Sequence, residues 1–137
     1  IPTIITQALA RDAIQLGNLD SIRDFTYVND TIEGFLCAGE SDKGLGEEFN
    51  LGTGEEIRIG ELTNLILRLV GREMKVTTDA GRLRPQHSEV MRLVSDNRKA
   101  REVLGWSPKV HLEEGLCYTI EWIRQHLDQY EIGKYEF

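Results

Sequence analysis

Apolar positions recur with the spacing of a helix in two stretches of the chain. The first stretch predicts a helix over residues 60–70, which Gly71 would end as a C-cap glycine. The second predicts a long final helix that begins near residue 112. The apolar stripe of the first helix is Leu62, Leu65, Ile66, Leu69 and Val70, and that of the second is Leu112, Leu116, Ile120, Ile123 and Leu127.

Two more helices are expected in the first third of the chain. Residues 1–10 are apolar and helix-compatible, and Pro2 is tolerated in a first turn. Asn29 or Asp30 can cap a second helix that runs through Ala38. The apolar packing face of this second helix would be Ile32, Phe35 and Leu36.

A shorter helix is expected late in the chain. Ser95 and Asp96 can cap it, residues 97–104 would form it, and Gly105 would end it. Trp106 follows this glycine and stands two residues before a proline, which predicts a buried anchor in a rigid connector.

Four short segments have the composition or the alternation of β-strands. They are residues 13–16, 24–28, 48–51 and 75–78, the last as an edge strand. Short strands that alternate with helices predict a small mixed α/β layer, not a complete doubly wound sheet. A length of 137 residues predicts one domain, which we place at residues 1–128, with a tail at 129–137.

The charge balance narrows the classes of partner. The formal charge is −7, from 16 basic and 23 acidic residues. A nucleic-acid-binding surface needs net basic patches, so we expect no nucleic-acid partner. A few local cations can still hold a small phosphate ligand. No apolar run approaches the ~20 residues that span a bilayer, so we expect no membrane partner.

Cys37 and Cys117 are the two cysteines of the chain. Both lie in apolar helical contexts without a redox or metal spacing, which predicts buried thiols in a reducing cytoplasm. No signal peptide is visible. No cluster of histidine, cysteine and carboxylate residues has the spacing of metal ligands, so no metal site is expected.

Arg23 is the first candidate ligand residue. Residues 23–30 read Arg-Asp-Phe-Thr-Tyr-Val-Asn-Asp and follow a turn at residues 17–20. A guanidinium presents a planar fork of donors that suits a diphosphate. The alternative is a local ion pair of Arg23 with Asp24 or Asp20.

Several runs, in this order and spacing, resemble the extended short-chain dehydrogenase/reductase enzymes that act on nucleotide sugars, most of all the GDP-mannose 4,6-dehydratase-like branch. The similarity covers roughly residues 1–128. The runs are Ile1-Pro2-Thr3-Ile4-Ile5, the block 17–30, Phe49-Asn50-Leu51-Gly52-Thr53-Gly54, Ile59-Gly60-Glu61-Leu62, Arg82-Leu83-Arg84-Pro85, and Asp96 through Leu104-Gly105-Trp106-Ser107-Pro108.

The resemblance implies that Arg23 and Arg84 contact the nucleotide diphosphate. Arg82 lies two residues before Arg84 and leaves the register open, and a solvated loop charge is the alternative for Arg84. Glu89 resembles the acidic residue that accepts hydrogen bonds from the ribose hydroxyls. It stands five residues after Arg84, whereas many relatives have a spacing of three, which puts this role in doubt.

Two further positions resemble ligand contacts of the family. The turn of Leu16 and Asn18 resembles the one that packs on the nucleotide base, where backbone groups could read the base edge. Asn50 stands where the family often has an asparagine near the ligand. An ordinary structural turn is the alternative at both places.

Two motifs resemble parts of a cofactor-dependent active site, but each lacks the neighbouring residues or the helix that such a site requires. Residues 52–54 begin like a dinucleotide fingerprint and lack the third glycine. Tyr130 and Lys134 have the spacing of the superfamily's catalytic pair, but Gly133 interrupts the segment after the last helix. We therefore expect neither a cofactor site nor a catalytic residue on this chain.

The resemblance implies the C-terminal, substrate-binding part of an NAD- or NADP-dependent 4,6-dehydratase or epimerase, with the Rossmann domain absent from this chain. That N-terminal domain would be its partner, would bind the cofactor and would carry the catalytic pair. The substrate would be a nucleoside-diphosphate sugar. The alternative is a stand-alone, non-catalytic nucleotide-sugar-binding module. The sequence leaves open the base, the sugar and whether a homodimer forms.

Overall fold

The structure is a computed structural model that describes residues 1–82 and 90–132. The chain passes back and forth between two compact units. Unit 1 comprises Ile1–Ser21, Arg58–Met91 and Leu116–Phe137, and unit 2 comprises Ile22–Ile57 and Arg92–Gly115.

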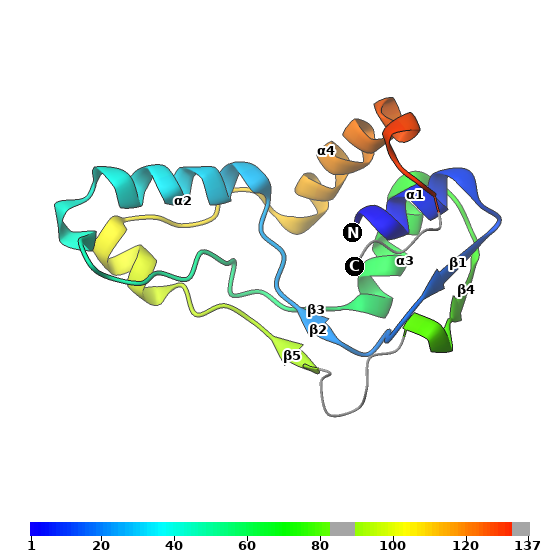
Figure 1. Ribbon diagram of the computed structural model, residues 1–137, viewed down its shortest axis with the longest axis horizontal. Coiled ribbons are helices and arrows are strands. Elements are labelled where there is room, and N and C mark those ends of the chain that lie inside the picture. Colours follow the sequence, from blue (N-terminus) through cyan, green and yellow to red (C-terminus); the bar gives the residue numbers. More distant parts are fainter. Residues whose placement is uncertain (83–89, 133–137) are drawn as a thin grey trace. The chain divides into compact units, whose positions relative to one another are not determined.

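Unit 1 is built around a pair of parallel strands. Strands β1 (Ala13–Leu16) and β4 (Lys75–Thr78) pair in the register that sets Ala13 opposite Lys75. Helix α1 (Pro2–Ala10) packs on β1 and on α3 (Ile59–Val70), as Figure 1 shows. The fully buried side chains of this unit include Ile5, Ile14, Leu62, Ile66, Leu116 and Ile123, the last two from α4 (Leu112–Gln125).

Gln7 ties α1 to the edge of this strand pair. Its side chain is fully buried, and its amide accepts a hydrogen bond from the Gln15 backbone nitrogen at 2.8 Å and donates one to the Gln15 carbonyl at 3.1 Å. A glutamine amide here takes the place of a neighbouring strand and satisfies a backbone donor and acceptor that burial would otherwise leave unpaired.

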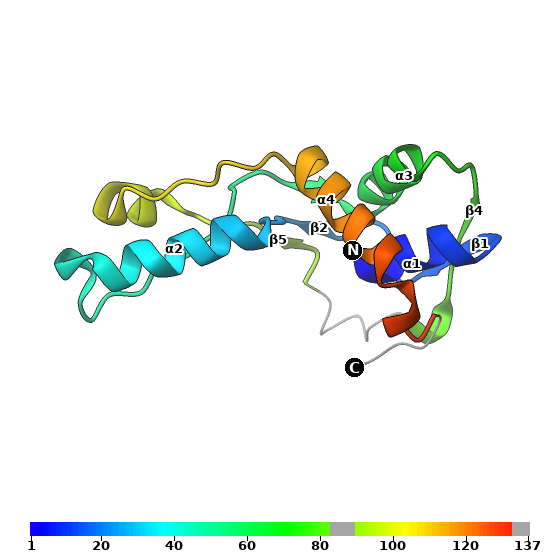
Figure 2. The same cartoon turned by 90° about the horizontal axis from the view of Figure 1, so that it is seen from above.

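Unit 2 has a small sheet and two helical segments. The sheet has the order β3 (Ile57–Arg58), β2 (Ile22–Arg23), β5 (Arg92–Leu93), and β2 and β5 are parallel. Helix α2 (Val28–Glu40) lies alongside a π-helical segment, Ala100–Leu104 (Figures 1 and 2). Short 3-10 helices occupy Asp42–Gly44 in this unit and Ala80–Arg82 and Leu127–Gln129 in unit 1.

Asp30 fixes the connector that follows Gly105. The indole nitrogen of Trp106 donates to the Asp30 carbonyl at 2.9 Å. The Asp30 carboxylate accepts hydrogen bonds from the backbone nitrogens of Lys109 at 3.1 Å and Val110 at 3.0 Å. Trp106 is 2% exposed, which confirms the predicted anchor.

The elements with a strong apolar period are confirmed, and so is the mixed α/β architecture. Helix α3 ends at Gly71, whose φ of 76° is the left-handed conformation that favours glycine. Strands β1 and β4 have the predicted bounds. Gly105 also adopts a left-handed conformation after the helical segment that precedes it.

Two predicted strands are wrong. Residues 24–28 contain no strand. Strand β2 ends at Arg23, which pairs with Leu93, the last residue of β5, and α2 begins at Val28. Residues 48–51 are irregular, since no described residue forms backbone hydrogen bonds with them. A strand needs a partner for its backbone groups, and the described chain provides none here.

Three further expectations for side chains in the helices are wrong. Tyr27, not Asn29 or Asp30, is the N-cap of α2, and Asp30 is used by the connector instead. The expected packing face of α2 is exposed. The thiols are both free, but Cys117 is exposed and Cys37 is half-buried. The exposed fractions on α2 are 51% for Ile32, 69% for Phe35 and 59% for Leu36.

We predict that Trp106→Ala lowers the free energy of unfolding by about 3–5 kcal/mol, because it removes a buried ring and leaves the Asp30 carbonyl without its donor. The matched control is Trp122→Ala, since Trp122 is 49% exposed and stacks on His126. The control should lose about 1 kcal/mol or less. Urea unfolding measures both, and equal losses would contradict the anchor role.

Candidate functional site

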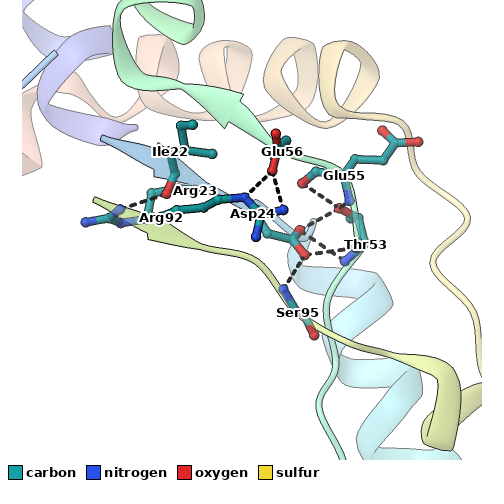
Figure 3. Close-up of polar contacts among 9 residues, drawn as sticks. Ile22, Arg23, Asp24, Thr53, Glu55, Glu56, Arg92 and Ser95 are labelled. Carbon is teal, nitrogen blue, oxygen red and sulfur yellow. Dashed lines mark hydrogen bonds and ion pairs between the residues drawn. The ribbon is translucent and has the colours of Figure 1, made fainter. Parts of the chain in front are cut away.

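The side chain of Asp24 connects three segments of unit 2, as Figure 3 shows. One carboxylate oxygen accepts from the backbone nitrogen and the hydroxyl of Thr53, at 3.1 and 2.5 Å. The other accepts from the backbone nitrogens of Gly54 at 2.9 Å and Ser95 at 3.2 Å. Hydrogen bonds to an ionised acceptor are stronger than neutral ones, so Asp24 holds the turn at 52–54 and the segment after β5 against β2.

Close packing explains the glycines of this turn. A Cβ atom on Gly52 would lie 2.2 Å from the Cβ of Ser95, so no side chain fits there. Gly54 has a φ of 78°, which favours glycine. Asn97 is 7% exposed and donates its amide to the Gly52 carbonyl at 2.7 Å. Ser95 thus fills the space beside Gly52, and Asn97 binds the backbone of the same residue.

Arg23 stands at the end of β2, directly before Asp24. Its side chain is half-buried, and its guanidinium donates to the Ile22 carbonyl at 2.7 Å. The alternative role expected for Arg23 was a local ion pair with Asp24 or Asp20. The Asp24 carboxylate accepts the four hydrogen bonds described above. Asp20 lies in unit 1, where it is 3.6 Å from the guanidinium of Arg58.

A second guanidinium lies on the neighbouring strand. Arg92 is opposite Ile22 in the parallel register of β2 and β5. Its Nε and Nη2 atoms lie 2.7 and 2.6 Å from one oxygen of Glu56. Glu56 offsets the charge of Arg92, and Figure 3 shows this ion pair. No local sequence pattern indicates the pair, because 36 residues separate the partners.

Asn50 lies in the irregular segment that precedes the Asp24-bound turn. Its side chain is exposed, whereas its neighbour Leu51 packs on α2. A Cβ on Gly34 would meet Leu51 Cδ1 at 2.6 Å. The structure therefore places Arg23 and Asn50 in the same unit, on segments that Asp24 ties to one turn.

Leu16 and Asn18 belong to unit 1 and shape one turn. The Leu16 side chain is 8% exposed, and its carbonyl accepts from the Asp79 backbone nitrogen at 2.7 Å. The Asn18 side chain accepts from the Asp20 backbone nitrogen at 2.9 Å and donates to the sulfur of Met91 at 3.4 Å. The apolar side chain of Leu16 is thus occupied in packing, and the half-buried side chain of Asn18 is engaged within the turn and with Met91.

The backbone of Arg82 packs against Gly17, which lies between Leu16 and Asn18 in that turn. Its carbonyl oxygen would lie 2.6 Å from a Cβ on Gly17, so the two backbones touch. Its guanidinium lies 3.3 Å from an Asp79 carboxylate oxygen and donates to the Gln15 carbonyl at 3.2 Å. Arg84 and Glu89, the other predicted ligand residues, lie outside the described residues.

The remaining candidates carry little chemistry. Tyr130 follows the last 3-10 helix and packs edge-on against Trp122 at 6.4 Å between ring centroids, and Lys134 lies outside the described residues. Within residues 1–82 and 90–132, no group of three histidine, cysteine or acidic residues could hold a metal ion. In the same ranges, no helix is long and apolar enough to cross a membrane.

A cavity of about 220 Å³ lies in unit 2. Its lining comes from Phe25, from residues 53 and 55–57, and from residues 108–112. Asp24 binds the second of these segments at Thr53, and Asp30 binds the third at Lys109 and Val110.

Comparisons with known proteins agree with this fold and its motifs. The family described as GDP-mannose 4,6 dehydratase matches residues 1–119. The UDP-glucose 4-epimerase of Mycolicibacterium smegmatis is 36% identical over 126 residues, which are 90% of this chain and 39% of that protein.

Solved structures show the same architecture. An epimerase from Methanothermobacter thermautotrophicus superposes with a TM-score of 0.84 at 28% identity, over 93% of this chain and 38% of that one. A UDP-glucuronic acid 4-epimerase from Bacillus cereus, in complex with UDP-glucuronic acid and NAD, gives a TM-score of 0.80 at 28% identity, over 90% of this chain and 39% of that one.

The fold and the sequence motifs define a protein of the nucleotide-sugar epimerase and dehydratase class. The chain belongs to the GDP-mannose 4,6 dehydratase family of extended short-chain dehydrogenases/reductases. It spans about two-fifths of the length of these relatives.

We predict that Asp24→Asn destabilises unit 2 by about 1.5–3 kcal/mol, because the amide NH₂ group would face at least one of the backbone donors that Asp24 now accepts. Amide exchange at Thr53, Gly54 and Ser95 should accelerate. The control is Asp42→Asn, an exposed carboxylate of the same unit, expected to change stability by about 0.5 kcal/mol or less. Unchanged exchange in Asp24→Asn would exclude the connecting role.

Proposed function

We propose that this chain is the substrate-binding portion of an NAD- or NADP-dependent nucleotide-sugar dehydratase or epimerase. The observation that carries the proposal is the family match over residues 1–119 together with the placement of Arg23. Arg23 belongs to the motif that resembles the family's diphosphate contact. Asp24 anchors the backbone beside it through four hydrogen bonds, so the guanidinium starts from a fixed position.

The residues of this chain would act by holding and orienting the substrate. Arg23 and Arg84 would contact the diphosphate, and Glu89 the ribose hydroxyls. The turn of Leu16 and Asn18 would pack on the base, with Asn50 near the ligand. Such remote contacts orient the sugar at the reacting centre, where they lower the entropic part of the barrier.

The redox chemistry would belong to a nicotinamide cofactor bound elsewhere in a longer protein. The cofactor supplies hydride transfer at the sugar. The turn at residues 52–54 does not fit it, since Ser95 fills the space beside Gly52. We place the cofactor and the catalytic pair in an N-terminal domain of the kind that relatives, more than twice as long, have room for. We expect that protein to work in the cytoplasm.

The diphosphate contact is tested by Arg23→Ala and Arg84→Ala in the full-length protein. Each charged hydrogen bond contributes roughly 1.5–3 kcal/mol, so each variant should bind UDP or GDP about 10- to 150-fold more weakly. Binding of the nucleoside alone should change little. Because both side chains would touch one group, the double mutant should show measurable coupling.

The matched control is Arg98→Ala. Arg98 is an exposed cation of unit 2 that pairs with Asp96, and its hydrogen bonds to Asp96 lower the pKa of that carboxyl to about 2. This variant loses the same charge without a proposed ligand contact, so its affinity should match the wild type. Near-neutral results for both Arg23→Ala and Arg84→Ala would remove the assigned function.

A second prediction concerns turnover. The 137-residue chain, mixed with NAD or NADP and a panel of nucleotide sugars, should form neither a 4-keto product nor an epimerised sugar nucleotide, whereas the longer protein should form one of the two. The reason is that no helical tyrosine and lysine pair stands in the described part of the chain. Turnover by the 137-residue chain alone would contradict the proposal that catalysis belongs to another domain. If the natural gene product binds nucleotide sugars without turnover, the stand-alone binding module would be favoured instead.

A further inference from the structure

The proposed function makes no use of the cavity in unit 2. Its volume of about 220 Å³ is below the roughly 300–1,000 Å³ of pockets for drug-sized ligands, so a ligand of this cavity has to be small. Phe25, Ile57 and Val110 are apolar members of its lining. The hydrogen bonds of Asp24 and Asp30 hold two of the lining segments, so the cavity needs little rearrangement to accept a ligand.

The cavity lies on the side of the small sheet that carries Arg92. In the parallel register, Arg92 is opposite Ile22, and Arg23 is opposite Leu93. Successive side chains of a strand alternate between its two faces, so Arg92 leaves the sheet on the face opposite to Arg23. Arg92 reaches Glu56, which lines the cavity. A ligand of the cavity is therefore separate from the diphosphate contact proposed for Arg23.

The acidic and lysine side chains of the lining differ in their partners. Glu56 is paired with Arg92, whose Nη2 atom lies 2.6 Å from its carboxylate. Lys109 is paired at 3.0 Å with Glu33, which belongs to α2 and does not line the cavity, and this contact raises the pKa of Lys109. Within the described ranges, no residue forms an ion pair or a hydrogen bond with the Glu55 carboxylate. The lining thus keeps one carboxylate available to a ligand.

We propose that this cavity is a binding site for a small organic cation, a free amine whose ammonium group carries a short apolar body. Glu55 would pair with the ammonium, and His111 offers a ring nitrogen that can accept a further hydrogen bond. The ring of Phe25 attracts a cation over its face, and the aliphatic side chains would cover the apolar body. A nucleotide is disfavoured there, because its phosphates have the same sign of charge as Glu55.

The exposure of Glu55 sets the strength of the charge preference. An ion pair that stays in contact with water is screened and contributes little, and an exposed cation over an aromatic ring contributes a similar amount. We therefore expect the cavity to prefer a cation over a neutral molecule of the same shape by about fivefold.

Three probes of nearly the same shape test this preference. Benzylamine, benzyl alcohol and benzoate are cationic, neutral and anionic at about pH 7. In ligand-observed NMR titrations of the full-length protein at about 0.15 M salt, benzylamine should bind about fivefold more tightly than benzyl alcohol, and benzoate more weakly than both. An absence of saturable benzylamine binding, or equal affinities for the amine and the alcohol, would overturn the proposal.

Matched variants locate the site. Glu55→Gln keeps the shape of an exposed side chain and removes its charge, so it should bring benzylamine close to the affinity of benzyl alcohol. Glu40→Gln makes the same change at an exposed position of unit 2 outside the lining and should keep the preference. Phe25→Leu should weaken benzylamine about two- to fivefold. A preference that survives Glu55→Gln, or that both glutamine variants lose, would contradict the site.

A further probe separates a free amine from a lysine of another protein, which carries the same ammonium group. Nα-acetyl-lysine methylamide presents that group on a peptide backbone. Weaker binding of this probe than of benzylamine would support a free molecule as the ligand. Tighter binding that Glu55→Gln abolishes would overturn that assignment in favour of a protein lysine.

Discussion

The Asp24 carboxylate is the contact on which the rest of unit 2 depends. Its two oxygens accept hydrogen bonds from residues 29 to 71 positions away, so one side chain fixes the spacing of β2, the turn at 52–54 and the segment after β5. A buried or half-buried carboxylate is tolerated only when its lone pairs are satisfied, and here backbone donors satisfy them. The position of Arg23 follows from this, because it is the residue before Asp24 on β2.

Unit 2 relies on such polar contacts because it buries little apolar surface. Its buried apolar residues are Ala100 and Trp106, whereas the others found in the described chain lie in unit 1. Asp24, Asp30 and Asn97 supply directional contacts where a core would otherwise supply packing. Unit 1 has the opposite balance, with Gln7 as a buried polar link inside an apolar core. The exposed apolar residues of α2, Ile32, Phe35 and Leu36, belong to the unit with fewer buried apolar residues.

The sequence predicted the elements whose partners lie within the chain. Helix α3, the apolar face of α4 and strands β1 and β4 carry periodic apolar residues that unit 1 buries. The prediction was wrong at residues 48–51 and on the face of α2, where the pattern requires a partner that the described chain does not contain. Arg23, Asn50, Leu16 and Asn18 could be named from motifs. Asp24 and the Arg92–Glu56 pair could not be assigned their roles, because contacts across tens of residues leave no local pattern.

One continuous stretch, residues 48–54, joins two kinds of contact in unit 2. In its first half Leu51 packs on α2 at Gly34, and in its second half Asp24 holds the turn at 52–54. Because Asp24 directly follows Arg23 in the chain, the hydrogen bonds that fix the turn also fix the backbone beside the proposed diphosphate contact. Binding energy from remote groups orients a substrate only when those groups are themselves held in place, so the Asp24 hydrogen bonds are what would let Arg23 position the diphosphate.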